Sequence, residues 1–325
     1  MKVLVTGGTG QVGGALVRAL LKRGDTVRCL VRNPARLANL DGVAGVELVA
    51  GDVTNPESLL KAVDGFEAVL HAAGMVSYDH LQNEQMWRVN VEGTQNMLDA
   101  AAAAGIRRFI LTGSIASLGY LPPGDVGNEQ TAWNWGDKAT AYMNTKRASQ
   151  QMVLDESRME TAVVMPGIVL GEGDVAGNGL RLLLQLWKGQ VPASPPGLTT
   201  ATTLSDVTQG HLLALDASSS GRAYVLSSWH GRFHDLYNAI SVELQCAPPP
   251  LIMPPWAVYL LAWQRTLADR IAKRPCRLPP ALARVVVRNR QYSAQRAMDE
   301  LGFQPQPIAE GIRACWQWAQ EQDLL

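Results

Sequence analysis

Apolar positions in the first half of the chain follow two alternating spacings. Short runs rich in valine, leucine and isoleucine predict strands at residues 2–6, 26–31, 46–50, 68–72, 108–112 and 161–165. Longer stretches with apolar residues at every third or fourth position predict helices at residues 11–23, 56–63, 84–104 and 140–158. Strands that alternate with helices form right-handed βαβ units, so this half predicts an α/β fold, a Rossmann-type doubly wound parallel sheet with helices on both faces.

The alternation loosens after Pro166, where glycines and prolines gather at 171–179 and 192–197. A helix at 205–218 and a strand at 222–227 are still predicted, and the tail is mostly helical with proline breaks. We therefore expect a Rossmann domain over residues 1–170, with returning elements from about 199–228, and a smaller, mostly helical C-terminal region over residues 171–325.

A glycine-rich turn connects the first strand to the first helix. Gly7, Gly10 and Gly13 follow a GxxGxxG spacing, in which the first glycine permits a tight turn, the second lets a pyrophosphate approach the backbone and the third allows close helix–strand packing. The helix N-terminus adds free N–H groups and a positive dipole. We therefore predict that this loop, with Thr9, Gln11 and Val12, binds the pyrophosphate of a nicotinamide dinucleotide.

The residue after the second strand bears on the choice between NAD and NADP. An acidic residue there binds the ribose hydroxyls of NAD, but this chain has Arg32, followed by Arg36. A guanidinium suits the 2′-phosphate of NADP. NADP is the predicted cofactor and NAD the alternative, in which case Arg32 stacks on the adenine.

Tyr142 and Lys146 lie four residues apart and therefore on one face of a helix. A phenol has a pKa of about 10, and a neighbouring ammonium favours its ionised form and lowers that pKa. Such a pair suits proton transfer in carbonyl and alcohol chemistry, although it also occurs on helix surfaces by chance. Ser114 follows a strand, at the edge of the sheet where ligands bind, and can hydrogen-bond a substrate oxygen; Ser117 is its competitor.

These motifs, in this order, resemble the extended short-chain dehydrogenase/reductase superfamily, the NAD-dependent epimerase/dehydratase family. Further matching segments are Gly51-Asp52-Val53, His71-Ala72-Ala73-Gly74, Asn90-Val91-Glu92-Gly93-Thr94 and Pro166-Gly167-Ile168-Val169-Leu170-Gly171. Val31-Arg32-Asn33-Pro34 and the segment 113–119 are most similar to the branch of dihydroflavonol 4-reductases and 3β-hydroxysteroid dehydrogenases.

The resemblance implies a role for each matching residue. Tyr142 would be the general acid/base, Lys146 would hold the nicotinamide ribose and tune Tyr142, and Ser114 would orient the substrate oxygen. Asn90 would support the site from the long helix, unless it is only a helix-surface amide. The remaining cofactor contacts implied are Asp52 and Val53 at the adenine, Ala72, Ala73 and Gly74 along the cleft, and Pro166 and Ile168 beside the nicotinamide.

The reaction expected is hydride transfer between the nicotinamide and a ketone or aldehyde, or the reverse oxidation of an alcohol. One alternative is a nucleotide-sugar epimerase with retained NAD, and another is a cofactor-binding regulator without turnover. A dehydratase is disfavoured, because Ile115 and Ala116 follow Ser114 where an acidic pair is usual.

Composition limits the classes of partner and substrate that we expect. The 29 basic and 29 acidic residues give zero net charge, so no global charge favours nucleic acid. Charged residues make up only 18%, which indicates a large core, an oligomer interface such as that of a homodimer, or an apolar substrate region. Five tryptophans are candidate pocket walls or core residues for an apolar or aromatic substrate, namely Trp133, Trp135, Trp187, Trp229 and Trp256.

Cysteines and termini indicate a cytoplasmic protein. Cys29, Cys246, Cys276 and Cys315 form no CxxC pair and the histidines add no ligand spacing, so we expect reduced thiols and no metal. The start of the chain predicts a strand rather than a signal peptide, and no apolar run reaches the length of a membrane span.

The most apolar stretch, 251–263, is expected to be a buried or interface helix. The alternative is peripheral membrane contact through Trp256, Tyr259 and Trp263.

Overall fold

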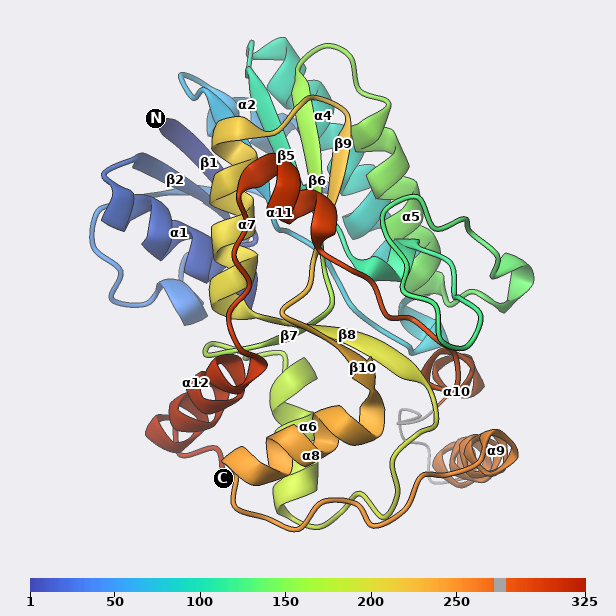
Figure 1. Ribbon diagram of the computed structural model, residues 1–325. Coiled ribbons are helices and arrows are strands. Elements are labelled where there is room, and N and C mark those ends of the chain that lie inside the picture. The colour runs from blue at the N-terminus through green and yellow to red at the C-terminus, as the bar shows by residue number, and fades with distance from the viewer. Residues whose placement is uncertain (272–278) are drawn as a thin grey trace.

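A computed structural model describes residues 1–271 and 279–325 (Figure 1). A seven-stranded parallel sheet of order β3-β2-β1-β4-β5-β6-β9 forms its centre. Its strands are β1 (Lys2–Thr6), β2 (Thr26–Val31), β3 (Val46–Ala50), β4 (Ala68–His71), β5 (Arg108–Thr112), β6 (Glu160–Pro166) and β9 (Arg222–Leu226). The strand order reverses between β1 and β4, which is where open α/β sheets of this type bind ligands.

Helices cover both faces of this sheet. Val3 and Val5 of β1 pack in one core with α1 (Gln11–Arg23), α7 (Leu204–Ala217) and α11 (Gln295–Leu301). Leu4 points to the opposite face and packs in a second core with α2 (Pro56–Val63), α4 (Gly93–Ala103) and α5 (Ala141–Leu154). Burial on both faces explains why the strands are continuous apolar runs.

A second, three-stranded sheet joins β10 (Trp229–Arg232), β8 (Leu198–Thr203) and β7 (Ile168–Leu170). It packs with α6 (Asn178–Trp187), α8 (Phe233–Glu243) and α12 (Ile308–Glu321) around a separate apolar core (Figure 1). Farther out, α9 (Pro255–Ile271) packs on α10 (Pro280–Val286). Within the described residues, short 3₁₀ turns lie at Ala38–Leu40, His80–Gln82, Ile115–Ser117 and Gly136–Lys138.

Two predicted helices differ in detail from the structure, which also has three strands outside the prediction. The helix expected at 84–104 is divided into α3 (Asn83–Trp87), a π-helical turn η3 (Arg88–Glu92) and α4. The helix expected at 140–158 ends at Leu154, and the strands β7, β8 and β10 were not predicted. β8 has the sequence LTTATT and is buried. Because threonine is polar, the spacing of apolar residues does not indicate a strand there.

Among residues 1–271 and 279–325 no helix is long and apolar enough to cross a membrane. Within the same ranges, no three histidine, cysteine or acidic side chains gather where they could hold a metal ion. Cys29, Cys246 and Cys315 are free thiols, and Cys276 lies outside the described residues.

Candidate active site

The glycine loop packs directly on the end of β4. Gly7 has a φ of +72°, and a Cβ there would lie 2.6 Å from the backbone of Ala72 and Ala73. A Cβ on Gly13 would lie 2.3 Å from the Gly7 carbonyl oxygen, whereas one on Gly10 would meet only that oxygen, at 3.2 Å. No side chain caps the N-terminus of α1, so its first N–H groups face outward with the helix dipole. This arrangement suits a pyrophosphate.

The other predicted loop residues differ in what they contact. The Gln11 amide nitrogen donates to the Gly171 carbonyl at 3.0 Å, which connects the loop to the end of β7. The Thr9 carbonyl accepts a hydrogen bond from Asn39, and Val12 packs against the apolar core beneath α1. Gln11 therefore supports the loop through its side chain and can offer a ligand only its backbone N–H.

Arg32 and Arg36 lie just beyond β2 with exposed side chains. In the described part of the chain neither guanidinium makes a hydrogen bond or ion pair, so both can meet a ligand. Asp52 follows β3, and one of its carboxylate oxygens accepts from the Thr54 N–H and hydroxyl, each at 2.8 Å. Val53 is buried against α4.

A buried histidine connects the glycine loop to the helix beside it. Thr94 Oγ1 donates to the Asn90 carbonyl at 2.7 Å, so it accepts from His71 Nε2, which lies 3.2 Å away. His71 Nδ1 then accepts from Thr6 Oγ1 at 2.8 Å, and that oxygen accepts from the Ala73 N–H at 3.1 Å. Burial lowers the pKa of His71 to about 3, so the ring is neutral and this chain of hydrogen bonds persists at neutral pH.

Asn90 lies in the π-helical turn and is buried. Its Oδ1 accepts from the Met75 N–H at 2.7 Å, while its Nδ2 donates to the Met75 carbonyl and to Thr145 Oγ1, at 2.9 and 3.0 Å. Thr145 lies on α5 between Tyr142 and Lys146. Asn90 therefore attaches the loop after β4 to the helix that carries both candidate catalytic groups, and it is not a helix-surface amide.

Ser114, Tyr142 and Lys146 converge at the carboxyl end of β5. Tyr142 is hydrogen-bonded to Ser114, whose Oγ also accepts from the Ala116 N–H at 3.1 Å. Lys146 Nζ donates to the Thr112 carbonyl at 2.9 Å. Ser117, the competitor of Ser114, lies instead within hydrogen-bond distance of the Ser114 carbonyl and of Gln150.

Residues predicted to line the cofactor cleft lie near these groups. A Cβ on Gly74 would lie 3.6 Å from Lys146 Nζ, so this glycine leaves room directly beside the ammonium. Pro166 ends β6 and is buried, while Ile168 begins β7 and is half-buried. An ammonium has three donors, so two remain on Lys146 for a ligand after the bond to Thr112.

Burial controls the ionisation of the site. It raises the pKa of Tyr142 to about 12, although the hydrogen bond from Ser114 and the charge of Arg290 act in the opposite direction. It lowers the pKa of Lys146 to about 8. The expected lowering of the tyrosine pKa by the lysine is therefore absent from this geometry, in which desolvation is the largest influence on both groups.

The structure brings in three residues that the sequence did not single out. The ring of Tyr78 packs edge-on against Tyr142, with centroids 6.2 Å apart. Arg290 donates to the Ile115 carbonyl at 3.2 Å and directs positive charge toward Tyr142. His211 of α7 accepts from Thr112 Oγ1 at 2.8 Å, behind the carbonyl that holds Lys146. No local motif identifies them, because each comes from a distant segment.

The five tryptophans have different surroundings. Trp135 is buried beside Tyr142, and Trp133 packs against the same cluster. Trp229 packs against the core of the second sheet. Trp187 and Trp256 are exposed and line no part of the candidate site.

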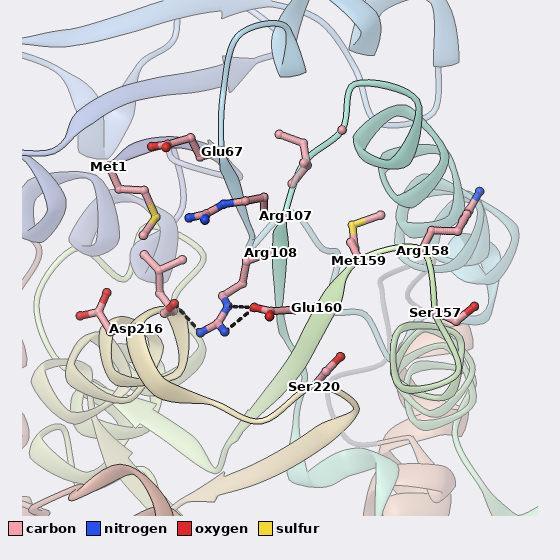
Figure 2. A pocket seen from close by; sticks show the side chains of 13 residues that line it. Met1, Glu67, Arg107, Arg108, Ser157, Arg158, Met159, Glu160, Asp216 and Ser220 are labelled. Atoms are coloured by element: carbon pink, nitrogen blue, oxygen red, sulfur yellow. Dashed lines mark hydrogen bonds and ion pairs between the residues drawn. The ribbon is translucent and has the colours of Figure 1, made fainter.

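A pocket of about 690 Å³ lies at the opposite, amino-terminal edge of the main sheet. Figure 2 shows Arg108 paired with Glu160 in this pocket. Parallel sheets of this kind bind ligands at their carboxyl edge, so this pocket is not the candidate active site.

Comparisons with known proteins identify the family. Residues 3–226 match the NAD dependent epimerase/dehydratase family. The chain is 30% identical to sterol demethylase protein B of Methylococcus capsulatus over 331 residues, which cover 100% of both proteins. It is 27% identical to a 3 beta-hydroxysteroid dehydrogenase/Delta 5→4-isomerase of Mycobacterium tuberculosis, over 94% of this chain and 86% of that one.

Among solved structures, the crystal structure of gox2253 superimposes with a TM-score of 0.87 at 27% identity and covers 99% of each chain. The chain therefore belongs to the NAD dependent epimerase/dehydratase family of extended short-chain dehydrogenases/reductases, a family of NAD(P)-dependent oxidoreductases and epimerases.

Proposed function

We propose that this protein is an NADP-dependent reductase that converts an apolar ketone or aldehyde to the alcohol, with Ser114, Tyr142 and Lys146 as its catalytic residues. The observation that carries the proposal is the convergence of two hydroxyls and a buried ammonium at the carboxyl end of β5, beside a glycine loop shaped for a pyrophosphate. NADPH bound along this cleft would supply the hydride.

Each residue then has a defined task. Ser114 donates a hydrogen bond to the substrate oxygen, and Tyr142 transfers its proton to that oxygen as negative charge develops there. Lys146 binds the nicotinamide ribose through its free donors, and the charge of Arg290 acts to stabilise the resulting tyrosinate. A phenol with a pKa of about 12 is fully protonated at neutral pH, which favours reduction over oxidation.

Replacing the proton donor tests the reaction. We expect Tyr142→Phe to lower kcat on the order of 10²- to 10⁴-fold, since general acid catalysis contributes about that much. NADPH oxidation by the purified protein is followed with a panel of fused-ring and aromatic ketones. Tyr237→Phe, which removes a buried hydroxyl from the core beside the three-stranded sheet, is the matched control and should keep wild-type turnover. Unchanged turnover in Tyr142→Phe would refute the mechanism.

The same assay separates reduction from epimerisation. A reductase consumes NADPH in proportion to the product formed, whereas an epimerase returns the hydride and consumes none. Dependence on added NADPH at substrate concentration therefore supports the proposal, and NAD that stays bound through purification opposes it.

We propose NADP because Arg32 and Arg36 offer two unpaired guanidinium groups just beyond β2. Arg32→Asp should weaken NADPH binding about 10- to 100-fold and leave NADH binding equal or tighter, because it removes a charge-assisted bond worth about 1.5–3 kcal/mol. Comparison of Arg36→Asp with Arg32→Asp shows which of the two arginines binds the 2′-phosphate of NADP. Titration of both cofactors into each variant measures this, and wild-type protein that binds NADH tenfold more tightly than NADPH contradicts the assignment.

We infer an apolar or aromatic ring system for the substrate. Tyr78 and Trp135 provide aromatic surface beside Tyr142, and the relatives reported above are named for sterols and hydroxysteroids. Aromatic walls with few polar groups are typical of pockets for such ligands.

A further inference from the structure

The outer face of α9 is an apolar stripe with no partner in the described chain. Trp256, Leu260, Trp263 and Leu267 recur at intervals of four, three and four residues and therefore share one face of the helix. Trp256 is 68% exposed and Trp263 62%. The opposite face packs on α10 through Val258 and Ala262, so the stripe is not needed to hold the helix in place.

Further exposed apolar residues precede the stripe in the chain. Leu251 and Ile252, just before α9, are also exposed, and α9 and α10 lie at the margin of the molecule (Figure 1). Monomeric soluble proteins rarely expose contiguous apolar surface of this kind unless it binds something. An isolated exposed leucine needs no explanation, but two tryptophans and two leucines in register do.

Positive charge borders the stripe on one side. Tyr259 of α9 lines a surface pocket of about 410 Å³ together with three cations, Lys138, Arg284 and Arg288, and a single carboxylate, Asp137. This combination of an apolar face and a cationic border complements an anionic surface that has an apolar interior.

We propose that α9 docks this protein on an anionic lipid bilayer, with the stripe inserted at the level of the acyl-chain boundary and the cationic pocket against the headgroup phosphates. Tryptophan rings prefer this depth, and basic residues near the surface strengthen the binding of anionic membranes. A 17-residue helix with a polar flank lies in the plane of the interface and does not cross it.

The pocket also lies close to the candidate active site. Its wall includes Tyr120 and Trp135, and Trp135 belongs to the apolar cluster against which Tyr142 packs. Docking through α9 thus places the membrane on the side of the molecule where an apolar substrate would enter. The docking surface itself is independent of the proposed reaction.

Sedimentation of the purified full-length protein with vesicles tests the proposal. We expect binding to vesicles of phosphatidylcholine mixed with phosphatidylglycerol, and much weaker binding to phosphatidylcholine alone. Trp256→Gln/Trp263→Gln should weaken binding at least about tenfold. Arg284→Gln/Arg288→Gln should remove most of the preference for anionic vesicles, as should high salt. Val242→Gln, at an exposed apolar residue on α8, is the matched control and should bind as the wild type does.

Three results would overturn the proposal. The first is wild-type protein that binds neither kind of vesicle. The second is a tryptophan double variant that binds as well as the control. The third is a wild-type dimer that this variant converts to a monomer, since a second copy would then cover the stripe. The thermal midpoint of each variant verifies folding, and Leu260→Gln/Leu267→Gln replaces the tryptophan pair if that pair does not fold.

Discussion

At the scale of single residues, burial rather than pairing determines which groups carry charge. His71 and His211 are both fully buried, and desolvation lowers their pKa values to about 3 and about 4. Both rings are therefore neutral, and each uses one nitrogen as donor and one as acceptor. They hold Thr6 and Thr112, which lie at the carboxyl ends of β1 and β5, where the cofactor loop and the candidate catalytic groups begin.

Burial of Lys146 destabilises the folded protein by an amount that depends on pH. Burial lowers its pKa from 10.5 to about 8, so between these values the unfolded chain keeps a proton that the folded chain has released. The free energy of unfolding therefore gains a contribution that rises with pH across this window and is constant below it.

We expect the unfolding free energy of the wild type, minus that of Lys146→Met, to increase by roughly 3 kcal/mol from pH 8 to pH 10.5. Denaturant titrations at a series of pH values measure it. Lys22→Met removes an exposed ammonium and controls for the change in net charge. A difference that stays flat across the window would show that Lys146 is not desolvated in the folded protein.

The sequence predicted candidate site residues that lie in local motifs. Gly7, Gly13 and the Tyr142/Lys146 pair have spacings that reflect short-range geometry, and the structure places them at one edge of the sheet. The pKa of Tyr142 could not be predicted in the same way, because desolvation depends on the segments that cover the ring. Arg290, which directs charge at it, lies more than a hundred residues away in the chain.

At the scale of elements, the π-helical turn η3 changes how the long helix meets its neighbours. The extra residue in this turn directs Asn90 toward the loop after β4 and toward α5, which it joins by three hydrogen bonds. Such bulges are common at functional sites. Apolar spacing predicted one continuous helix here, because a single inserted residue shifts the pattern too little to be read.

Asn90→Ala should leave the Met75 backbone groups and Thr145 without their partner, at a cost of about 1–3 kcal/mol in unfolding free energy. It should also lower kcat and raise the KM for NADPH, because the loop and α5 lose their common anchor. Asn96→Ala removes one hydrogen bond, to the Val53 carbonyl, from the adjoining helix and is the control. Equal effects of the two variants on kcat, in the ketone assay, would assign Asn90 a purely structural role.

At the scale of the whole molecule, the parallel sheet was predictable and the second sheet was not. Strands such as β1 and β4 are buried on both faces and therefore apolar over most of their length. β7 has three residues, β8 is rich in threonine and β10 is only half-buried, so none presents a clear period. The contacts that define these strands are between segments about thirty residues apart, as in the pairing of Ile168 with Ala201.

The position of β9 has a consequence for how the chain reaches this shape. β9 is the edge strand of the parallel sheet and pairs with β6, yet the chain first forms β7, α6, β8 and α7 before it returns. During synthesis on the ribosome, β6 therefore remains an open, apolar edge until Leu226 has emerged. Throughout that interval the nascent chain offers other strands a place to pair, so the risk of aggregation during synthesis is concentrated at this edge.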